Sequence, residues 1–412
     1  MKWSPVRAGL SLLVASVLAA SLAVVQSAPA SADSLVWARQ FAGSSFNQGF
    51  GVAMDSTGVY VAGQYSSNNT WDAFLKKYDV GGTQLWSRYR FCQPGREQGA
   101  TVTAGDSGVY AIADFDKQRP PFFSLLSRYE PDGTHDWNVR LSPDLALRPD
   151  SPGSAVAQAV ASDESGVYVG GDVNFPLPGG GWADRPFIVK FDPLGNELWS
   201  HRFGIGNGIS DIAVGTEGVA VVGTTGYGSS PTRGRDPFVR VYTTTGELSW
   251  KRRFDTPESD FGANVSFDSN GLYVAGFRIG STYVGFVRRL DLAGDTEWRR
   301  LLASTINVEV TGACSPQVGD GVMIAGWGGD LSGAPSQTTE GFVRTYDANG
   351  KVVATTYIAS ANPVEPGGLG PTFLNDIAAS NDGVYVTGST DGTFPGQWKH
   401  AFEDDAFVAR VA

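Results

Sequence analysis

Short runs of alternating apolar and polar residues recur along the chain, and one run returns several times. Residues 72–86 (DAFLKKYDVGGTQLW) have close variants at 187–199 and 342–350. Alternation over four to eight residues, bounded by Asp and Gly, is typical of half-buried strands joined by tight turns. The run therefore predicts a strand, a turn and a second strand.

A longer unit surrounds this run. Its first copy predicts strands at 50–54, 59–63, 73–78 and about 86–89, tight turns at 55–58 and 79–82, and a loop at 64–71. The clearest marker is a Gly followed by a hydrophobic residue, usually with Tyr next, which opens the second strand. It occurs, 50 to 62 residues apart, at Gly58, Gly108, Gly166, Gly218, Gly271, Gly321 and Gly383. A fixed period of this length indicates a repeat architecture.

The third and fourth strands carry aromatic marks of their own. The third has Phe74, Phe187, Phe238, Phe286, Phe342 and Phe407, with Leu125 in the second unit; the fourth has Trp86, Trp137, Trp199, Trp250 and Trp298, with Ala354 in the sixth. A sheet this apolar cannot cover both of its faces by itself, and radial stacking covers them. We therefore predict an all-β, seven-bladed β-propeller of four-stranded antiparallel blades, forming a single domain at 33–412.

The seventh unit supplies only three strands before Ala412, whereas residues 34–41 form an isolated strand with the Trp of a fourth strand. Pairing the N-terminal strand at 34–41 with the C-terminal blade completes that blade and leaves no open edge between the ends. We expect this pairing to close the ring.

Residues 1–32 have the pattern of a signal peptide. Lys2 and Arg7 precede an apolar run at 8–25, and Ala30-Ser31-Ala32 is a small-x-small cleavage site. A membrane anchor is the less favoured alternative, because the run is short and no second apolar segment follows. We expect a secreted protein, cleaved after about Ala32, with no membrane element afterwards.

Charge and cysteine content narrow the class of partner. The formal net charge is −11, and about −13 once Lys2 and Arg7 are removed. An acidic chain is a poor partner for nucleic acid or anionic lipid. Cys92 and Cys314 are too few for a disulfide framework and lie on separate repeats, so both are expected to be unpaired.

The runs at 72–79, 376–396 and 405–410 resemble the bacterial β-propeller repeat called SBBP. The resemblance spans essentially all of 34–412 and implies an exported or surface propeller, in a family mostly without a known activity. The Gly-x-x-x-Trp rhythm is more distantly similar to the repeats of quinoprotein dehydrogenases, but the eight repeats and the adjacent Cys pair usual there are missing.

The loops expected between second and third strands, at 64–71, 114–121 and 172–186 among others, vary most, so specific binding is expected at that end of the propeller. Their aromatic residues suit stacking against a sugar or a peptide side chain, although each could instead only pin its own loop. The inner strands carry polar residues at corresponding places, which could grip a ligand or a cation or face a water-filled channel. The predicted ligand-binding residues are Trp71, Trp182, Tyr227, Trp327, Trp398, Asp211, Asn264 and Asp376; the inner ring also contains Thr101 and Gln158.

Catalytic chemistry has weaker support. The three His residues do not cluster, so neither a metal site nor an activated nucleophile is predicted. The Asp-rich turns, at Asp55 for example, lack the spacing of a calcium loop and are interpreted as turn formers. Acids near the starts of third strands could form an acid–base pair or only bond locally; they are Asp72, Asp184, Asp236, Glu340, Asp404 and Asp405.

The first functional hypothesis is a monomeric, non-enzymatic binding or scaffold protein that contacts carbohydrate or another extracellular protein, without cofactor or metal. The alternative is an extracellular hydrolase or lyase with carboxylates at the channel mouth. A purely structural module is a third possibility. Three or more acids converging in one pocket would favour the enzyme, and aromatics flanking a shallow surface would favour the binding protein.

Overall fold

The structure, a computed structural model, describes residues 35–41, 46–67, 70–89, 97–115, 123–141, 153–177, 179–204, 207–225, 234–256, 258–316, 319–331, 339–362, 368–398 and 404–412. The regular elements within these ranges are β-strands, grouped mainly in four-stranded antiparallel sheets. The all-β class and the four-stranded antiparallel sheets predicted from the repeat are therefore confirmed. Among the same residues, no helix is long and apolar enough to cross a membrane.

Most sheets are built from strands that follow one another in the chain. The first contains β2 (Asn47–Asp55), β3 (Gly58–Ser67), β4 (Thr70–Tyr78) and β5 (Gln84–Tyr89). The next two contain β6 (Glu97–Gly105), β7 (Gly108–Phe115), β8 (Phe123–Tyr129) and β9 (His135–Leu141), then β10 (Ser154–Asp163), β11 (Gly166–Pro176), β12 (Trp182–Phe191) and β13 (Glu197–Arg202). A parallel bridge between Ala155 and Phe123 links these two into one eight-stranded sheet.

The second half of the chain repeats the plan. Its sheets contain β14 (Asn207–Gly215), β15 (Gly218–Thr225), β16 (Asp236–Tyr242) and β17 (Leu248–Arg253); β18 (Ser259–Phe267), β19 (Gly271–Ile279), β20 (Tyr283–Asp291) and β21 (Thr296–Leu302); and β22 (Val308–Cys314), β23 (Gly321–Gly328), β24 (Glu340–Asp347) and β25 (Val352–Ile358). A short hairpin of β26 (Ser360–Ala361) and β27 (Leu369–Gly370) precedes the last sheet.

The last sheet joins the two ends of the described chain. Its order is β1 (Leu35–Phe41), β30 (Asp405–Val411), β29 (Gly383–Thr390) and β28 (Thr372–Ser380). β1 and β30 pair antiparallel, with Ala38 opposite Ala409 and Phe41 opposite Ala406. The expected pairing of the N-terminal strand with the C-terminal strand is thus present over residues 35–41.

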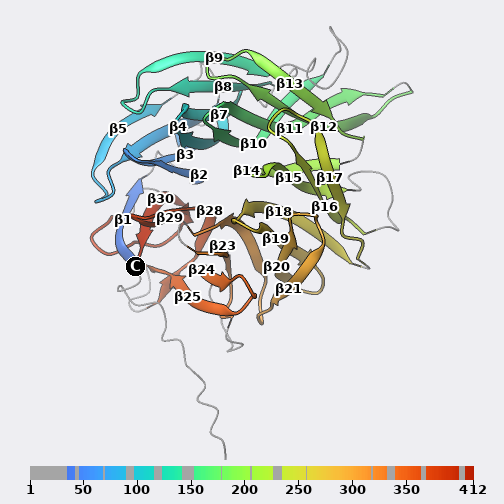
Figure 1. Ribbon diagram of the computed structural model, residues 1–412. Helices are drawn as coiled ribbons and strands as arrows, with labels where there is room; N and C mark the ends of the chain where they lie inside the picture. Colours follow the sequence, from blue (N-terminus) through green and yellow to red (C-terminus); the bar gives the residue numbers. More distant parts are fainter. Residues whose placement is uncertain are drawn as a thin grey trace, which may run out of the picture.

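The sheets are arranged radially, with their first strands innermost (Figure 1). The strands β2, β6, β10, β14, β18, β22 and β28 lie next to one another in this order, and β28 also lies against β2. Apolar layers fill the spaces between neighbouring sheets, as radial stacking requires. Where the two ends of the order meet, Tyr385 and Val408 pack in one cluster with Val59 and Phe74.

A tryptophan on the outermost strand ties each of several sheets to the next. The indole Nε1 donates to a backbone carbonyl in the turn between the third and fourth strands of the neighbouring sheet. The pairs are Trp86 with Pro131 (3.1 Å), Trp137 with Pro193 (3.0 Å), Trp199 with Thr244 (3.1 Å), Trp250 with Leu292 (2.8 Å), Trp298 with Ala348 (2.7 Å) and Trp37 with Val80 (3.0 Å). Trp37 lies on β1, so the last sheet is tied to the first by the same bond.

The ring of each tryptophan also lies on the turn glycine. In the turn that receives Trp37, Gly82 has φ of +85°, a region that favours glycine. A Cβ there would lie 2.6 Å from a Trp37 ring atom. The glycine is therefore required by both the backbone conformation and the tryptophan.

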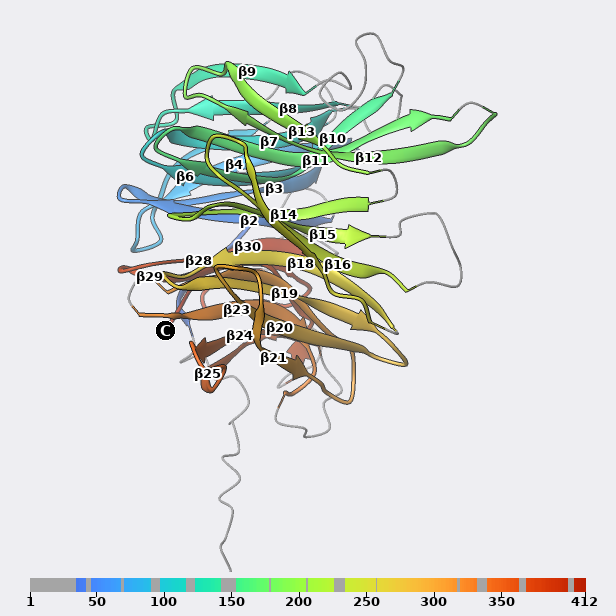
Figure 2. The same cartoon turned by 45° about the vertical axis from the view of Figure 1, so that its right-hand side comes forward.

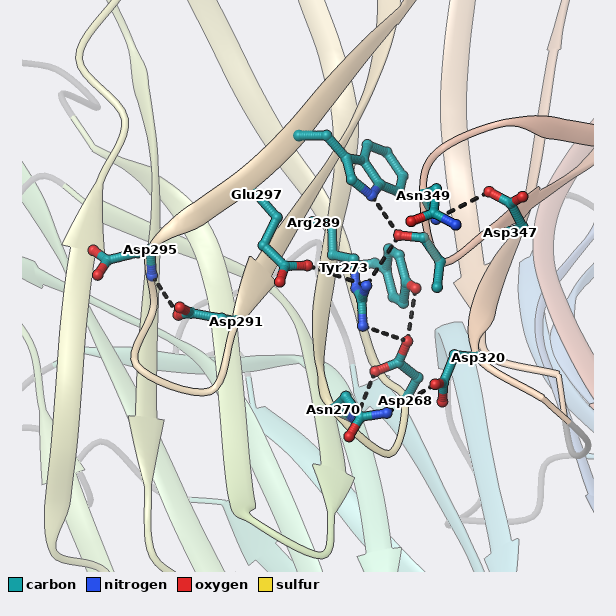
Figure 3. Close-up of polar contacts among 12 residues, drawn as sticks. Asp268, Asn270, Tyr273, Arg289, Asp291, Asp295, Glu297, Asp320, Asp347 and Asn349 are labelled. Carbon is teal, nitrogen blue, oxygen red and sulfur yellow. Dashed lines mark hydrogen bonds and ion pairs between the residues drawn. The ribbon is translucent and has the colours of Figure 1, made fainter.

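A cation from the third strand reinforces several of these contacts. Arg289 donates to the Ala348 carbonyl (2.9 Å) that also accepts from Trp298. Figure 3 shows the guanidinium reaching Asp268, which also accepts from the hydroxyl of Tyr273 (2.7 Å) and from the backbone N–H of Asn270 (2.9 Å). Lys77, Lys190 and Arg410 repeat this bond to the carbonyls of Pro131, Thr244 and Val80.

The missing tryptophan of the sixth sheet now has an explanation. Ala354 on β25 occupies the position that Trp298 holds on β21, opposite Thr345 as Trp298 is opposite Arg289. The turn that such a tryptophan would contact does not exist, because the third and fourth strands of the last sheet, β30 and β1, come from opposite ends of the chain.

Several predicted boundaries were wrong. The segments 64–71 and 172–186 were expected to be loops, but β3 continues to Ser67 and β12 begins at Trp182. On each of these two second strands a glycine, Gly63 or Gly171, precedes the polar residues at its end, and we call it the inner glycine. The polar residues beyond it keep pairing across these hairpins, so the strands run past the point where apolar alternation stops. Cys314 is a free thiol whose pKa is raised by burial. Cys92 and the signal segment 1–32 lie outside the described residues.

Trp37→Ala is expected to destabilise the fold by about 3 kcal/mol, the lower end of the range for truncating a packed Trp. The change removes the bond to Val80 and the contacts with Tyr78 and Tyr385, whose ring centroids lie 6.4 and 5.8 Å away. Urea unfolding measures the loss, and Trp398→Ala, at an 81% exposed residue, is the matched control. Equal midpoints for the two variants would show that β1 does not hold the sheets together.

Candidate functional site

A cavity of about 1060 Å³ lies at the centre of the radial arrangement. Residues of β2, β6, β10, β14, β18, β22 and β28 contribute to its wall. The inner strands carry register shifts where they face it, between Ile209 and Asp211 and between Leu374 and Asp376 for example. Such bulges redirect side chains locally, and here they accompany a polar lining.

The lining is acidic and otherwise uncharged. Among the described residues that form it, none is Lys, Arg or His. Amide and hydroxyl side chains, such as Gln64, Asn174 and Thr224, fill much of the remaining polar surface, and Phe50, Phe261 and Phe277 are its aromatic members. The carboxylates are those of Asp114, Asp172, Asp184, Asp211 and Asp376.

Asp172 and Asp184 stand on the paired strands β11 and β12. Gln158 Nε2 donates to Asp172 Oδ2 (2.8 Å), and Asn174 Nδ2 donates to Asp184 Oδ1 (2.8 Å). Burial, with a further contribution from the charge of Asp184, raises the pKa of Asp172 to about 7. Asp172 can therefore exist as acid or as base near neutral pH, which is what proton transfer in catalysis requires.

Asp211 and Asp376 connect the inner strands of neighbouring sheets. Asp211 Oδ2 accepts from the backbone N–H of Val265 on β18, and Asp376 Oδ2 accepts from that of Val52 on β2, both at 2.9 Å. Burial raises the pKa of each carboxyl to about 7, although these N–H donors oppose the shift. Each of these two carboxyl groups therefore bonds to the next sheet and also lines the cavity.

Asp114 is held more tightly. It is 3% exposed, and the hydroxyl of Ser124 on the adjacent strand donates to it. Ser124 Oγ in turn accepts from the backbone N–H of Ala157 on β10 (2.8 Å). This chain of bonds fixes the carboxylate relative to the next sheet.

One position on the second strand of each sheet explains why part of the cavity lining is acidic and part is aromatic. The residue after the inner glycine of the second strand, a place that Ala113 takes in the second sheet, is acidic in the second and third sheets and aromatic in the fifth and sixth. Phe277 stacks on Phe261 and Tyr283, with centroids at 5.1 and 5.5 Å. In chain order the residues at this position are Gln64, Asp114, Asp172, Thr224, Phe277, Trp327 and Ser389.

The predicted inner residues Asp211, Asn264 and Asp376 line this cavity, as do Thr101 and Gln158. Gln158 differs from the others because it lies within the bulge of β10, so Ala159 is the residue in the equivalent place. The sequence has no signal for where a bulge adds a residue.

The four predicted aromatic residues that the structure describes are not part of the cavity lining. Trp182 is 59% exposed at the start of β12, in the hairpin with β11 that projects beyond the other sheets (Figure 2). Trp71 packs against Phe46 (6.0 Å) and Trp327 against Phe373 (5.3 Å), so each supports its own surroundings. Trp398 is exposed, and Tyr227 lies outside the described residues.

The acids at the starts of third strands do not converge as a set. Of these, only Asp184 is among the described lining residues. Asp405 is fully buried and accepts from Gln40 Nε2 (2.8 Å), and Asp236 accepts from the backbone N–H of Thr256 (3.0 Å). Asp114 and Asp172 were missed because they had been placed in loops; their position directly after the second strand's core could have identified them.

The turn acids behave as the sequence predicted. Asp55 Oδ1 accepts from the backbone N–H of Thr57 and Oδ2 from the hydroxyl of Tyr60, both at 2.7 Å. These bonds close the turn and bury the tyrosine. In the part of the chain that is described, no group of three or more His, Cys, Asp or Glu residues is placed to hold a metal ion.

No protein-family model and no curated protein matches the chain. It is similar to Pseudomonas aeruginosa periplasmic gluconolactonase (14% identity over 75% of this chain and 85% of that one, TM-score 0.49). It is also similar to a mutant of Synechocystis apocarotenoid oxygenase (11%, 91% and 93%, 0.42) and to Trypanosoma rangeli sialidase in complex with sialic acid (10%, 87% and 59%, 0.44). These similarities concern the overall fold, and they do not identify SBBP-type repeats.

The expectation of a non-enzymatic binding or scaffold protein is wrong on the criterion drawn from the sequence. Five aspartates converge in one cavity, whereas Trp182 and Trp398 are exposed outside it. The alternative, a hydrolase or lyase, fits these findings better.

Asp376→Asn is expected to change how stability depends on pH. In the unfolded chain Asp376 loses its proton near 3.8, whereas in the fold it keeps it up to about 7. Its contribution to the free energy of unfolding therefore falls as pH rises from about 4 to 7. Urea unfolding at pH 4.5 and 7.5 should show the wild type losing about 2 kcal/mol relative to the variant.

Asp295→Asn is the control for this measurement, because that side chain is 76% exposed. It should leave the pH dependence of the wild type unchanged. If Asp376→Asn also leaves it unchanged, the carboxyl does not retain its proton in the fold.

Proposed function

We propose that the protein is a hydrolase or lyase that acts in its central cavity through aspartate side chains. The observation that carries this proposal is the convergence of five aspartates on one cavity whose described lining has no basic residue. Acid–base catalysis on a C–O bond needs one carboxyl that can donate a proton and a second that can accept one. Asp172 and Asp184 are the pair best placed for these roles.

Asp172 is the general acid in this proposal. Its raised pKa keeps a proton available near neutral pH for the leaving-group oxygen. Asp184, oriented by Asn174, accepts a proton from water in a hydrolase or from substrate carbon in a lyase. Gln158 orients Asp172 in the same way.

A hydroxyl-rich substrate, such as a saccharide, suits the rest of the lining. The amides of Gln64, Asn264 and Asn375 and the hydroxyl of Thr311 offer donors and acceptors to hydroxyl groups. Phe261 and Phe277 offer an apolar surface for the face of a sugar ring. An anionic substrate is disfavoured by repulsion from the carboxylates.

The proposal also covers the number of blades, the closure of the ring and the export of the protein. The chain forms one domain at 33–412, a closed propeller of seven blades, in which the β1–β30 pair completes the seventh. The seven inner strands in ring order and the Trp37 bond to Val80 support this. The protein is exported as a monomer after cleavage near Ala32, as the signal-like segment and the resemblance to SBBP-type repeats suggest.

Asp172→Asn and Asp184→Asn are each expected to lower kcat by about 100-fold or more on whichever substrate is turned over. The screen uses aryl glycosides, oligosaccharides, lactones and uronate-free polysaccharides. Asp295→Asn is the control and should retain full activity, and unfolding midpoints check that both cavity variants are folded. Folded Asp172→Asn and Asp184→Asn proteins with full activity would place the chemistry elsewhere.

A further inference from the structure

We propose that the cavity selects a saccharide that carries a free amino group, with the ammonium at the aspartate wall and a sugar ring on the phenylalanine wall. This inference rests on the proposed function for the choice of a saccharide. It goes further in assigning the substrate a positive charge.

The first support is that the described residues supply no positive charge to balance these acids. In the described part of the chain, the donors to Asp172, Asp184, Asp211 and Asp376 are neutral amides and backbone N–H groups. Within the described residues, none of these four carboxylates forms an ion pair. These carboxylates are half-buried, and carboxylates withdrawn from water are ordinarily paired with a cation, so a positive group on the ligand would supply the missing partner.

The second support is that the arginine side chains near the site already contact other groups. Asp260, 2% exposed, binds Arg278 (2.8 Å) and Arg299 (3.3 Å). Arg235 lies over the ring of Phe261, 5.1 Å from its centroid. Arg235 thus contacts the aromatic side of the site, and none of the three arginines lines the cavity. The acids therefore keep an attractive potential for a cation that enters from solvent.

The third support is that acidic and aromatic side chains line different parts of the cavity wall. Asp114 and Asp172 occupy the same strand position as Phe277, three and two sheets away along the order. The acids and the stacked Phe261–Phe277 pair thus belong to different sectors of one cavity. A ligand with a charge at one end and a flat apolar face at the other contacts both sectors, and the phenylalanine rings take the apolar face.

A metal ion is a poorer occupant than an amine. No three ligating side chains among the described residues are placed to hold one. A single ammonium needs only one or two carboxylates, and Asp172 and Asp184 on adjacent strands provide them. The cavity volume of about 1060 Å³ also exceeds what an ion alone requires.

Binding of three trisaccharides by isothermal titration tests this inference without relying on turnover. The probes are the trimer of glucosamine, the trimer of N-acetylglucosamine and the trimer of galacturonic acid. The glucosamine trimer is expected to bind at least 10-fold more tightly than the acetylated trimer, and the galacturonic acid trimer not measurably. Raising NaCl from 20 to 500 mM should reduce this preference, because salt screens the attraction.

Variants show which residues cause the preference for the amino sugar. Asp184→Asn should reduce the preference for the amine to less than threefold, and Asp295→Asn should leave it unchanged. Phe277→Leu should weaken both neutral and cationic probes by a similar factor and keep their ratio. Equal binding of the glucosamine and N-acetylglucosamine trimers, or an unchanged ratio in folded Asp184→Asn, overturns the inference.

The binding experiment can fail independently of the proposed enzymatic function. If neutral saccharides are hydrolysed and Asp172→Asn abolishes this, but no preference for the amine exists, only the inference fails. If the preference for the amine depends on Asp184 but no substrate is turned over, only the enzymatic role fails.

Discussion

The bond from each outer tryptophan to the turn of the next sheet is the interaction on which the architecture depends. It places a large ring over a glycine in the left-handed region and satisfies the indole N–H on the neighbouring carbonyl. Isolated four-stranded sheets of this composition could not cover both faces. The same contact recurs between Trp37 and Val80, where the two ends of the chain meet.

A scaffold held at its outer rim leaves the inner positions free to vary. Residues in the turns and on the outer strands repeat because each must fit the next sheet. The position after the inner glycine has no such partner, and it changes from Asp172 to Thr224 to Phe277. Chemical specificity is therefore concentrated where the repeat is least regular.

Much of the fold was predictable, because period, turn chemistry and the orphan strand at 34–41 are all local features of the sequence. The inner residues Asp211 and Asp376 were also found, since they recur at one place in the repeat. Asp114 and Asp172 were missed because strand ends beyond the apolar alternation look like loops. Their pairing across the hairpin, and the bulge that exposes Gln158, depend on contacts that a single sequence does not display.

The central claim is that a set of aspartates withdrawn from water, without cationic partners among the described residues, forms the reactive surface. The most direct measurement is a ¹³C NMR titration of the aspartate carboxyl carbons, with assignments from Asp172→Asn, Asp211→Asn and Asp376→Asn. Three carboxyl signals titrating near pH 7 are expected. Titration of all three below pH 5 would contradict the account, because these acids would then be solvated or paired like ordinary surface carboxylates.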